Sequence, residues 1–208
     1  MSPRKAAAVR AGGRTLREHL VATAERMISE RGTAALTVRA IAREAGVADG
    51  VLYNHFADKE ELLAHALRAH IEAVERTLPP LPDPGTATVE ENLRVYVEHG
   101  LMLHNGILPA LAGLLAQPEV LARFAALSGG GEHWRDRLNA YLRAERDLGL
   151  LAPDARGEAV TSIIVGVCHE SVLSVLLQGD GPVRRVPPEE VDDLVAAVLN
   201  GIAPRRNS

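Results

Sequence analysis

Apolar residues recur at spacings of three and four along almost the whole chain, and this helical periodicity constrains the fold more than any other feature. The sequence shows no strand-like alternation and no internal repeat. The pattern therefore predicts an all-α fold of about nine helices, with two shorter helices taken as one pair. The expected helices cover residues 14–31, 37–45, 48–56, 58–78, 88–105, 107–117 paired with 118–127, 132–148, 155–178 and 187–203.

The composition is typical of a globular cytoplasmic protein. Of the 208 residues, 47% are apolar and 24% are charged, which excludes wholesale disorder. The longest strongly apolar run, residues 163–168, is far shorter than the roughly 20 residues of a membrane span. Cys168 is the single cysteine, so an internal disulfide and a multi-cysteine zinc site are excluded. The N-terminus has no apolar signal core, so we expect a cytoplasmic protein that is not secreted.

Charge and proline content divide the chain. Residues 1–59 hold 10 Lys/Arg against 6 Asp/Glu, whereas residues 60–208 hold 13 against 21. A basic N-terminal segment followed by an acidic remainder suggests that the N-terminal segment binds a polyanion. Residues 78–86 contain four prolines and cannot continue a helix, so this segment is a linker. We predict one domain over residues 1–59 and a second, helical domain over residues 60–208.

Residues 36–63 contain the pattern that indicates function. It predicts a helix, a turn at Gly46, and a second short helix whose apolar residues pack against the first. The short helix then presents Tyr53, Asn54 and His55 outward, which makes a poor core. Because the major groove of DNA admits one helix, and these side chains can donate to phosphates or base edges, the segment is typical of a DNA reader.

This stretch resembles the helix-turn-helix of the tetracycline-repressor-like (TetR) family of bacterial transcription regulators, most strongly over residues 14–67. The most specific part reads Gly50-Val-Leu-Tyr-Asn-His-Phe-x-x-Lys59-Glu60-x-Leu62. The resemblance implies that Thr37 touches a phosphate and that Lys59 holds a phosphate at the start of the fourth helix. It also implies that the groove or its walls are faced by Arg39, Asp49, Gly50, Tyr53, Asn54 and His55, and that Ala48 lies at a position that contacts DNA.

Two of these positions depart from the family pattern. Ala48 stands where Ser or Thr is common, so one hydroxyl contact to phosphate is lost. Asp49 stands where Lys or Arg is frequent, and its carboxylate either accepts from a cytosine amine or weakens binding near phosphates. A basic arm can compensate through phosphate contacts or minor-groove insertion. The arm comprises Arg4, Lys5, Arg10, Arg14 and Arg17.

Signals for catalysis or metal binding are weak. His169-Glu170 begins like a zinc-protease motif, but Leu173 stands at the second histidine position. His99 and His104 are five residues apart, a poor helical spacing for one metal ion. We therefore expect no enzyme activity, no metal and no cofactor. Two alternatives stay open: an enzyme on a co-opted fold, and a structural dimer with a degenerate DNA head.

A small-molecule site is plausible in the second domain, because most aromatic residues beyond the motif fall on its helices. The alternative interpretation is that these aromatic residues belong to an ordinary apolar core. The hypothesis places an effector cavity among Val95, His99, Met102, Leu103, Trp134, Leu138, Tyr141, Val167 and Glu170.

The last two helices indicate a homodimer. Residues 155–178 are apolar on nearly every face, and residues 187–203 carry one apolar stripe, so both need cover. Two such helices from each subunit make a four-helix bundle across a twofold axis. Two reading helices then meet successive major grooves about 34–36 Å apart. The expected function is a cytoplasmic, nucleoid-associated repressor of a pseudo-palindromic operator, released by a small apolar or amphipathic effector; activation is the alternative.

Overall fold

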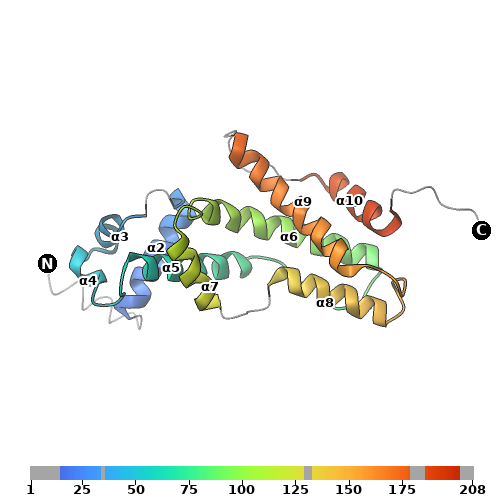
Figure 1. The fold of residues 1–208 in the computed structure, drawn as a ribbon, viewed down its shortest axis with the longest axis horizontal. Coiled ribbons are helices and arrows are strands. Elements are labelled where there is room, and N and C mark those ends of the chain that lie inside the picture. Colours follow the sequence, from blue (N-terminus) through green and yellow to red (C-terminus); the bar gives the residue numbers. More distant parts are fainter. Residues whose placement is uncertain (1–14, 34–35, 129–132, 179–185, 202–208) are drawn as a thin grey trace, which may run out of the picture. The chain divides into compact units, whose positions relative to one another are not determined.

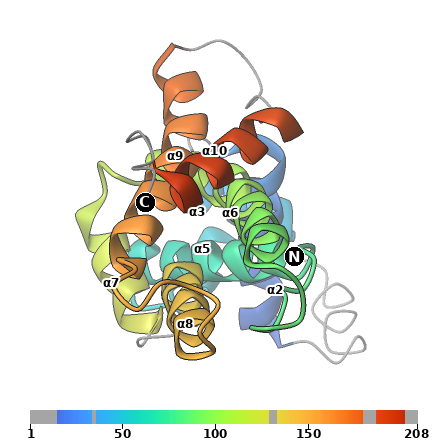
Figure 2. The same cartoon turned by 90° about the vertical axis from the view of Figure 1, so that its right-hand side faces the viewer.

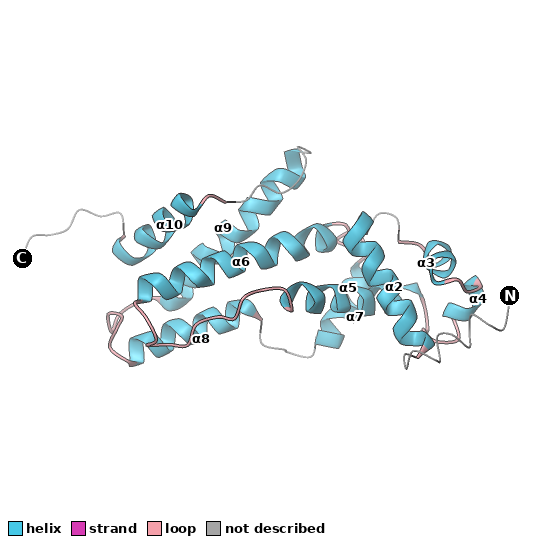
Figure 3. Ribbon diagram, turned by 180° about the vertical axis from the view of Figure 1, so that it is seen from behind, coloured by secondary structure: helices cyan, strands magenta, loops and turns pink. Residues whose placement is uncertain are grey.

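A computed structural model describes residues 15–33, 36–128, 133–178 and 186–201. These residues form nine helices and no strand, which confirms the all-α prediction (Figure 3). Figure 1 labels the helices in chain order. They are α2 (Leu16–Arg31), α3 (Val38–Ala45), α4 (Asp49–Leu52), α5 (Lys59–Glu75), α6 (Val89–Ala112), α7 (Pro118–Ser128), α8 (Trp134–Asp147), α9 (Gly157–Gln178) and α10 (Pro188–Asn200).

The helices group into two compact units. Unit 1 comprises residues 1–77 and 106–131, and unit 2 comprises residues 78–105 and 132–208. The boundary falls once inside α6, between Asn105 and Gly106. Packing therefore groups α5 and α7 with the helix-turn-helix. The functional division at residue 59 stays a prediction.

Unit 1 is built on an apolar core. Helix α2 packs against α5, α5 packs against α7, and α3 contacts both α2 and α4. Leu20, Ile41, Leu52 and Leu67 are all almost fully buried in this core. The short α3 and α4 are thus held by tertiary packing, which is what stabilises helices too short to persist alone.

Side-chain caps start α2 and α5 of unit 1. The Thr15 hydroxyl accepts from the Glu18 amide, and the Glu18 carboxylate accepts from the Thr15 amide in return. Asp58 caps α5 by accepting from the Glu61 amide at 2.8 Å. Each cap satisfies backbone donors that the first helical turn leaves without partners.

The predicted helix end near residue 105 is wrong. Helix α6 continues through Gly106 and Pro109 to Ala112, so residues 107–117 are not a separate helix. Gly106 serves packing rather than termination, since a Cβ there would lie 2.6 Å from Val74 Cγ1. Pro109 lies inside the helix, where its missing N–H removes one backbone hydrogen bond without ending the element.

The predicted third helix, residues 48–56, is shorter than expected. Only Asp49–Leu52 form α4, and the chain then continues in tight turns through His55. The His55 and Phe56 amides both donate to the Leu52 carbonyl, which keeps the turn compact. Tyr53, Asn54 and His55 are therefore carried by a turn and not by a helix of nine residues.

Unit 2 has an interior rich in aromatic and polar side chains. Helix α8 packs against α9 (Figure 2). Tyr96 stacks on Tyr141 with ring centroids 4.5 Å apart, and Trp134 lies 5.3 Å from His104. A Cβ at Gly100 would lie 2.3 Å from the Trp134 ring, so only glycine admits the indole at this position.

Helix α9 leaves much of its apolar surface uncovered. Ile163 is 52% exposed and Leu177 is 86% exposed. By length and composition alone α9 could cross a membrane, a finding that the short apolar run in the sequence did not predict. A core or interface helix of a soluble protein passes the same test, so the observation establishes only that α9 is apolar and 28% buried over its most apolar window.

Candidate nucleic-acid interface

A left-handed turn between α3 and α4 sets the geometry of the interface. Gly46 ends α3 with φ of +72°, a conformation that costs other residues free energy, and its amide donates to the Ala42 carbonyl. The Val47 amide then donates to the same carbonyl at 2.9 Å. The chain therefore turns sharply and places α4 against α3, as the sequence predicts.

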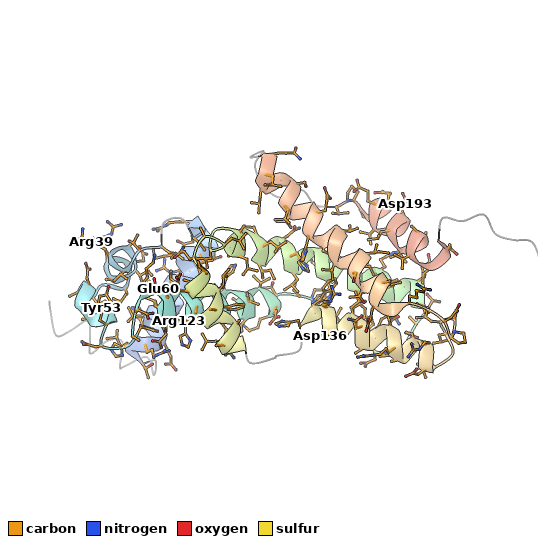
Figure 4. All side chains as sticks on the ribbon, in the orientation of Figure 1. Arg39, Tyr53, Glu60, Arg123, Asp136 and Asp193 are labelled. Carbon is orange, nitrogen blue, oxygen red and sulfur yellow. The ribbon has the colours of Figure 1, made fainter. Side chains whose placement is uncertain are left out.

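The two residues directly after α4 are exposed. Tyr53 is 58% exposed and Asn54 is exposed, whereas His55 is half-buried. In Figure 4, the labelled Arg39 and Tyr53 project outward from α3 and from the turn after α4. Gly50 is exposed, with open space where its Cβ would be. The exposed Tyr53 and Asn54 thus form a polar surface on an apolar base of Leu52 and Phe56, both of which are buried.

Arg39 and Asp49 form an ion pair across the two motif helices. The Arg39 Nε lies 3.5 Å from the Asp49 Oδ2, and the side chains are 89% and 51% exposed. An ion pair this exposed contributes little stability, so either group can exchange its partner for DNA at small cost. Asp49, which departs from the family pattern, is thus paired with Arg39, which is predicted to face the groove.

Thr37 and Ala48 occupy the starts of α3 and α4. The Thr37 hydroxyl caps α3 by accepting from the Ala40 amide at 3.1 Å. Ala48 stands at the corresponding position of α4 and provides no side-chain cap, because it has no acceptor. Both residues are exposed, so Thr37 keeps its hydroxyl proton available for a phosphate oxygen.

Lys59 begins α5, and residues far along the sequence hold that helix start. The Lys59 Nζ donates to the Gln117 amide oxygen at 3.4 Å, and the Arg123 guanidinium donates to Asp58, the cap of α5. Figure 4 labels Arg123 at this site beside Glu60. Gln117 and Arg123 could not be found from the motif, because only the packing of α7 on α5 brings them to it.

Arg17 is engaged inside unit 1 instead of extending as part of the basic arm. Its guanidinium lies 2.6 Å from the Glu61 carboxylate and 4.4 Å from the Phe56 ring centroid. The Ala57 amide and then Arg17 lower the pKa of Glu61, and burial followed by Arg17 lowers the pKa of His65. The other four arm residues, Arg4, Lys5, Arg10 and Arg14, lie outside the described residues.

The predicted effector residues divide between core and surface of unit 2. Buried members are His99, Leu103, Trp134, Leu138 and Tyr141, whereas Met102 and Glu170 are exposed and Val95 and Val167 are half-buried. His99 donates to the Pro79 carbonyl at 3.1 Å, and burial lowers its pKa. Burial and the nearby Glu145 carboxylate raise the pKa of Tyr141. A cavity among these nine residues stays a prediction.

Comparison with known proteins supports the interface. The family model described as bacterial regulatory proteins, tetR family, matches residues 20–66, which include the whole helix-turn-helix. The HTH-type transcriptional repressor KstR2 of Mycobacterium tuberculosis is 46% identical over 56 residues. That segment is 27% of this chain and spans 28% of the relative's length.

Solved structures extend the similarity beyond the motif, to 90% of this chain in one case. The TetR-family regulator SCO0332 is 25% identical, with a TM-score of 0.59, covering 90% of this chain and 98% of that one. FadR of Bacillus subtilis, solved in complex with stearoyl-CoA, is 20% identical with a TM-score of 0.56 and covers 89% and 99% of the two chains, which shows a shared fold. Residues 20–66 thus match the model of the tetR family, and the fold of the chain is similar to that of a solved TetR-family regulator.

Proposed function

We propose that this protein is a transcriptional repressor that binds a pseudo-palindromic DNA operator as a homodimer. The observation that carries the proposal is the exposure of Tyr53 and Asn54 on a base formed by buried Leu52 and Phe56, within the segment that matches the family model. Tyrosine and asparagine on such a surface can reach base edges and phosphates of the major groove. Thr37, Arg39 and Lys59 surround them with phosphate-binding chemistry.

A second copy of the chain is the proposed cover for α9 and α10. Helix α9 exposes Ile163, Leu173, Leu176 and Leu177, which is unfavourable in water for a single chain. A homodimer buries such a face in a four-helix bundle. It also duplicates the reading surface, by which we mean the exposed Tyr53 and Asn54 with Arg39 beside them. If the two copies bind successive major grooves on one side of the DNA, the half-sites lie about 34–36 Å apart, one helical turn.

Release from DNA by a small molecule completes the proposal. Solved neighbours of the same fold include a FadR complex with stearoyl-CoA and a regulator complex with choline. For this chain we propose an apolar or amphipathic effector bound by unit 2, and a cytoplasmic, nucleoid-associated location. A shift from nearly full to nearly empty operator needs about 5.5 kcal/mol of differential binding, which two sites in a dimer can share.

A salt-titrated gel shift against the DNA that flanks the gene tests the proposal. Binding is expected to weaken steeply with salt, because phosphate contacts release counterions. Lys59→Ala is expected to reduce the salt slope by about one and to weaken all sequences alike. Tyr53→Ala is expected to weaken operator binding more than non-specific binding.

Two results would contradict the proposal. One is a purified protein that stays monomeric at the concentrations used for DNA binding, measured by sedimentation. The other is equal operator affinity in the wild type and in the Tyr53→Ala, Lys59→Ala double variant. Asp83→Asn, an exposed change in unit 2, controls for a general effect of altered surface charge on migration.

A further inference from the structure

Unit 2 contains a hollow of about 440 Å³ between the second half of α8 and the segment that leads into α9. The volume falls in the range of small-molecule sites. None of the nine effector residues predicted from the sequence lines it. Its walls include Leu142, Arg143, Arg146, Leu151, Arg156 and Glu158.

The walls of this hollow are positively charged. Three arginines face one carboxylate, that of Glu158. Arg146 approaches Asp147 at 3.6 Å, but Arg143 and Arg156 form no ion pair with any residue in the described part of the chain. Residues 78–105 and 132–208 together hold 10 Lys/Arg and 16 Asp/Glu, so a local excess of arginine is not an average property of this unit.

The same hollow has an apolar side. Leu142 is buried, and Leu151 and Ala155 are half-buried beside it. Guanidinium groups bind carboxylate and phosphate through paired hydrogen bonds, and aliphatic side chains favour an apolar body. Arg143 and Arg156 are exposed, so a neutral apolar ligand would leave them bound only to water, and a bare anion would leave Leu151 and Ala155 partly exposed.

We propose that this hollow binds an amphipathic anion, an apolar molecule that ends in a carboxylate or a phosphate. Arg143 and Arg156 hold the anionic group, and Leu142, Leu151 and Ala155 contact the apolar part. The inference deepens the proposed function, on which its regulatory meaning rests, because it assigns a chemical class to the effector. It places the effector in a hollow that neither Leu138 nor Tyr141 lines, although both were predicted to bind it.

Calorimetric titration of the full-length protein tests the site without DNA. The probes are octyl phosphate, octanoate, octan-1-ol and inorganic phosphate. Octyl phosphate or octanoate is expected to bind about tenfold or more tightly than octan-1-ol and than inorganic phosphate, since each of the latter makes only half of the contacts. The tighter of the two anions identifies the source as a phosphate or a carboxylate.

Three variants locate the site. Arg143→Gln combined with Arg156→Gln is expected to weaken the tighter anion about tenfold or more, and to leave octan-1-ol unchanged. Ala155→Trp fills the hollow and is expected to abolish binding while both arginines remain. Arg137→Gln, an exposed change on the same helix outside the hollow, is the matched control and is expected to bind like the wild type.

The site is overturned if octan-1-ol binds as tightly as the anions, or if binding survives either the double variant or Ala155→Trp. The circular dichroism spectrum and the unfolding midpoint of each variant must match those of the wild type. The values for Arg137→Gln show how large a difference an exposed substitution on this helix causes. A gel shift then tests regulation: octyl phosphate or octanoate is expected to weaken operator binding in the wild type and not in the double variant. If the bound anion leaves operator binding unchanged, the effector role is overturned. If the protein binds no operator at all, the proposed function is overturned, but the calorimetric result for the hollow still stands.

Discussion

The two units of this protein differ in which residues they bury: unit 1 exposes the polar residues of its motif, whereas unit 2 buries polar residues and exposes apolar ones. Unit 1 buries Thr23, Thr33 and His70 but otherwise keeps an apolar interior, and it exposes Tyr53 and Asn54. Unit 2 buries a larger polar set and exposes apolar residues of α9 instead. That buried set comprises Asn92, His99, His104, Glu145 and Thr161.

This difference follows from what each unit contacts. A surface that binds DNA must offer hydrogen-bond donors to phosphates and base edges, so its polar side chains are exposed and only the residues beneath them are apolar and buried. A unit with a polar interior must satisfy each buried group internally, as Glu145 does in part by accepting from the Gly85 amide at 3.1 Å. Substitutions in unit 1 at exposed polar positions should therefore change binding, and substitutions inside unit 2 should change stability.

Two tyrosines give the largest expected contrast. Tyr96→Ala removes a ring stacked on Tyr141 and should lower the free energy of unfolding by about 3–5 kcal/mol. Tyr53→Ala removes an exposed ring and should change stability by less than about 0.5 kcal/mol, while operator affinity falls by about 1–3 kcal/mol. Urea unfolding and gel shifts measure the two quantities.

Phenylalanine variants control this comparison. Tyr96→Phe keeps the stacked ring and should recover most of the lost stability. A stability loss in Tyr53→Ala equal to that in Tyr96→Ala would show that Tyr53 is a core residue and would remove the basis of the reading surface.

Two glycines give a smaller contrast of the same kind. Gly100→Ala places a Cβ 2.3 Å from the buried Trp134 ring and should cost about 1–3 kcal/mol. Gly50→Ala meets nothing within 4 Å and should leave stability unchanged or slightly raised. Thermal unfolding followed by Trp134 fluorescence should separate them, and an unchanged midpoint in Gly100→Ala would contradict the close packing.

Local signals made the helices and the reading motif predictable. Caps at Thr15, Thr37 and Asp58 and the turn at Gly46 lie within a few residues of the elements that they define. The end of α6 was missed because Gly106 resembles a breaker in sequence, and only its packing on Val74 reveals its use. The turn after α4 was missed because a periodic apolar pattern does not mark where hydrogen bonding changes.

Long-range contacts account for the rest of what the sequence did not reveal. Gln117 and Arg123 meet the head of α5 from more than fifty residues away. Aromatic and histidine content pointed to Trp134 and Tyr141 as effector residues, yet large rings fill a core equally well. The three arginines of the hollow share no recognisable motif, since Arg156 joins the others only through the fold.

Asp49→Asn sharpens the description of the reading surface. The change removes one negative charge beside Arg39 and frees its guanidinium, so binding to non-specific DNA should tighten by about 1 kcal/mol or less. The salt slope should rise by about one, because one more cation is available to phosphate. Selection from random DNA measures the second effect: if Asp49 accepts from a cytosine amine, the variant loses preference at one base pair, and if it only repels phosphate, the preference is unchanged.

Acidification provides the smallest expected contrast. Burial lowers the pKa of both His99 and His104, so near their ordinary pKa of about 6.5 the unfolded chain binds more protons than the folded one. The free energy of unfolding should therefore rise with pH. The contribution of these two histidines is fully present above about pH 6.5 and is lost as the pH falls below that value. Urea midpoints from about pH 7.5 to about pH 5.5 measure the slope. His104→Gln should flatten it, while His133→Gln, an exposed change on the same unit, should not; an equal slope in all three proteins would mean that the interior of unit 2 admits protonated histidine.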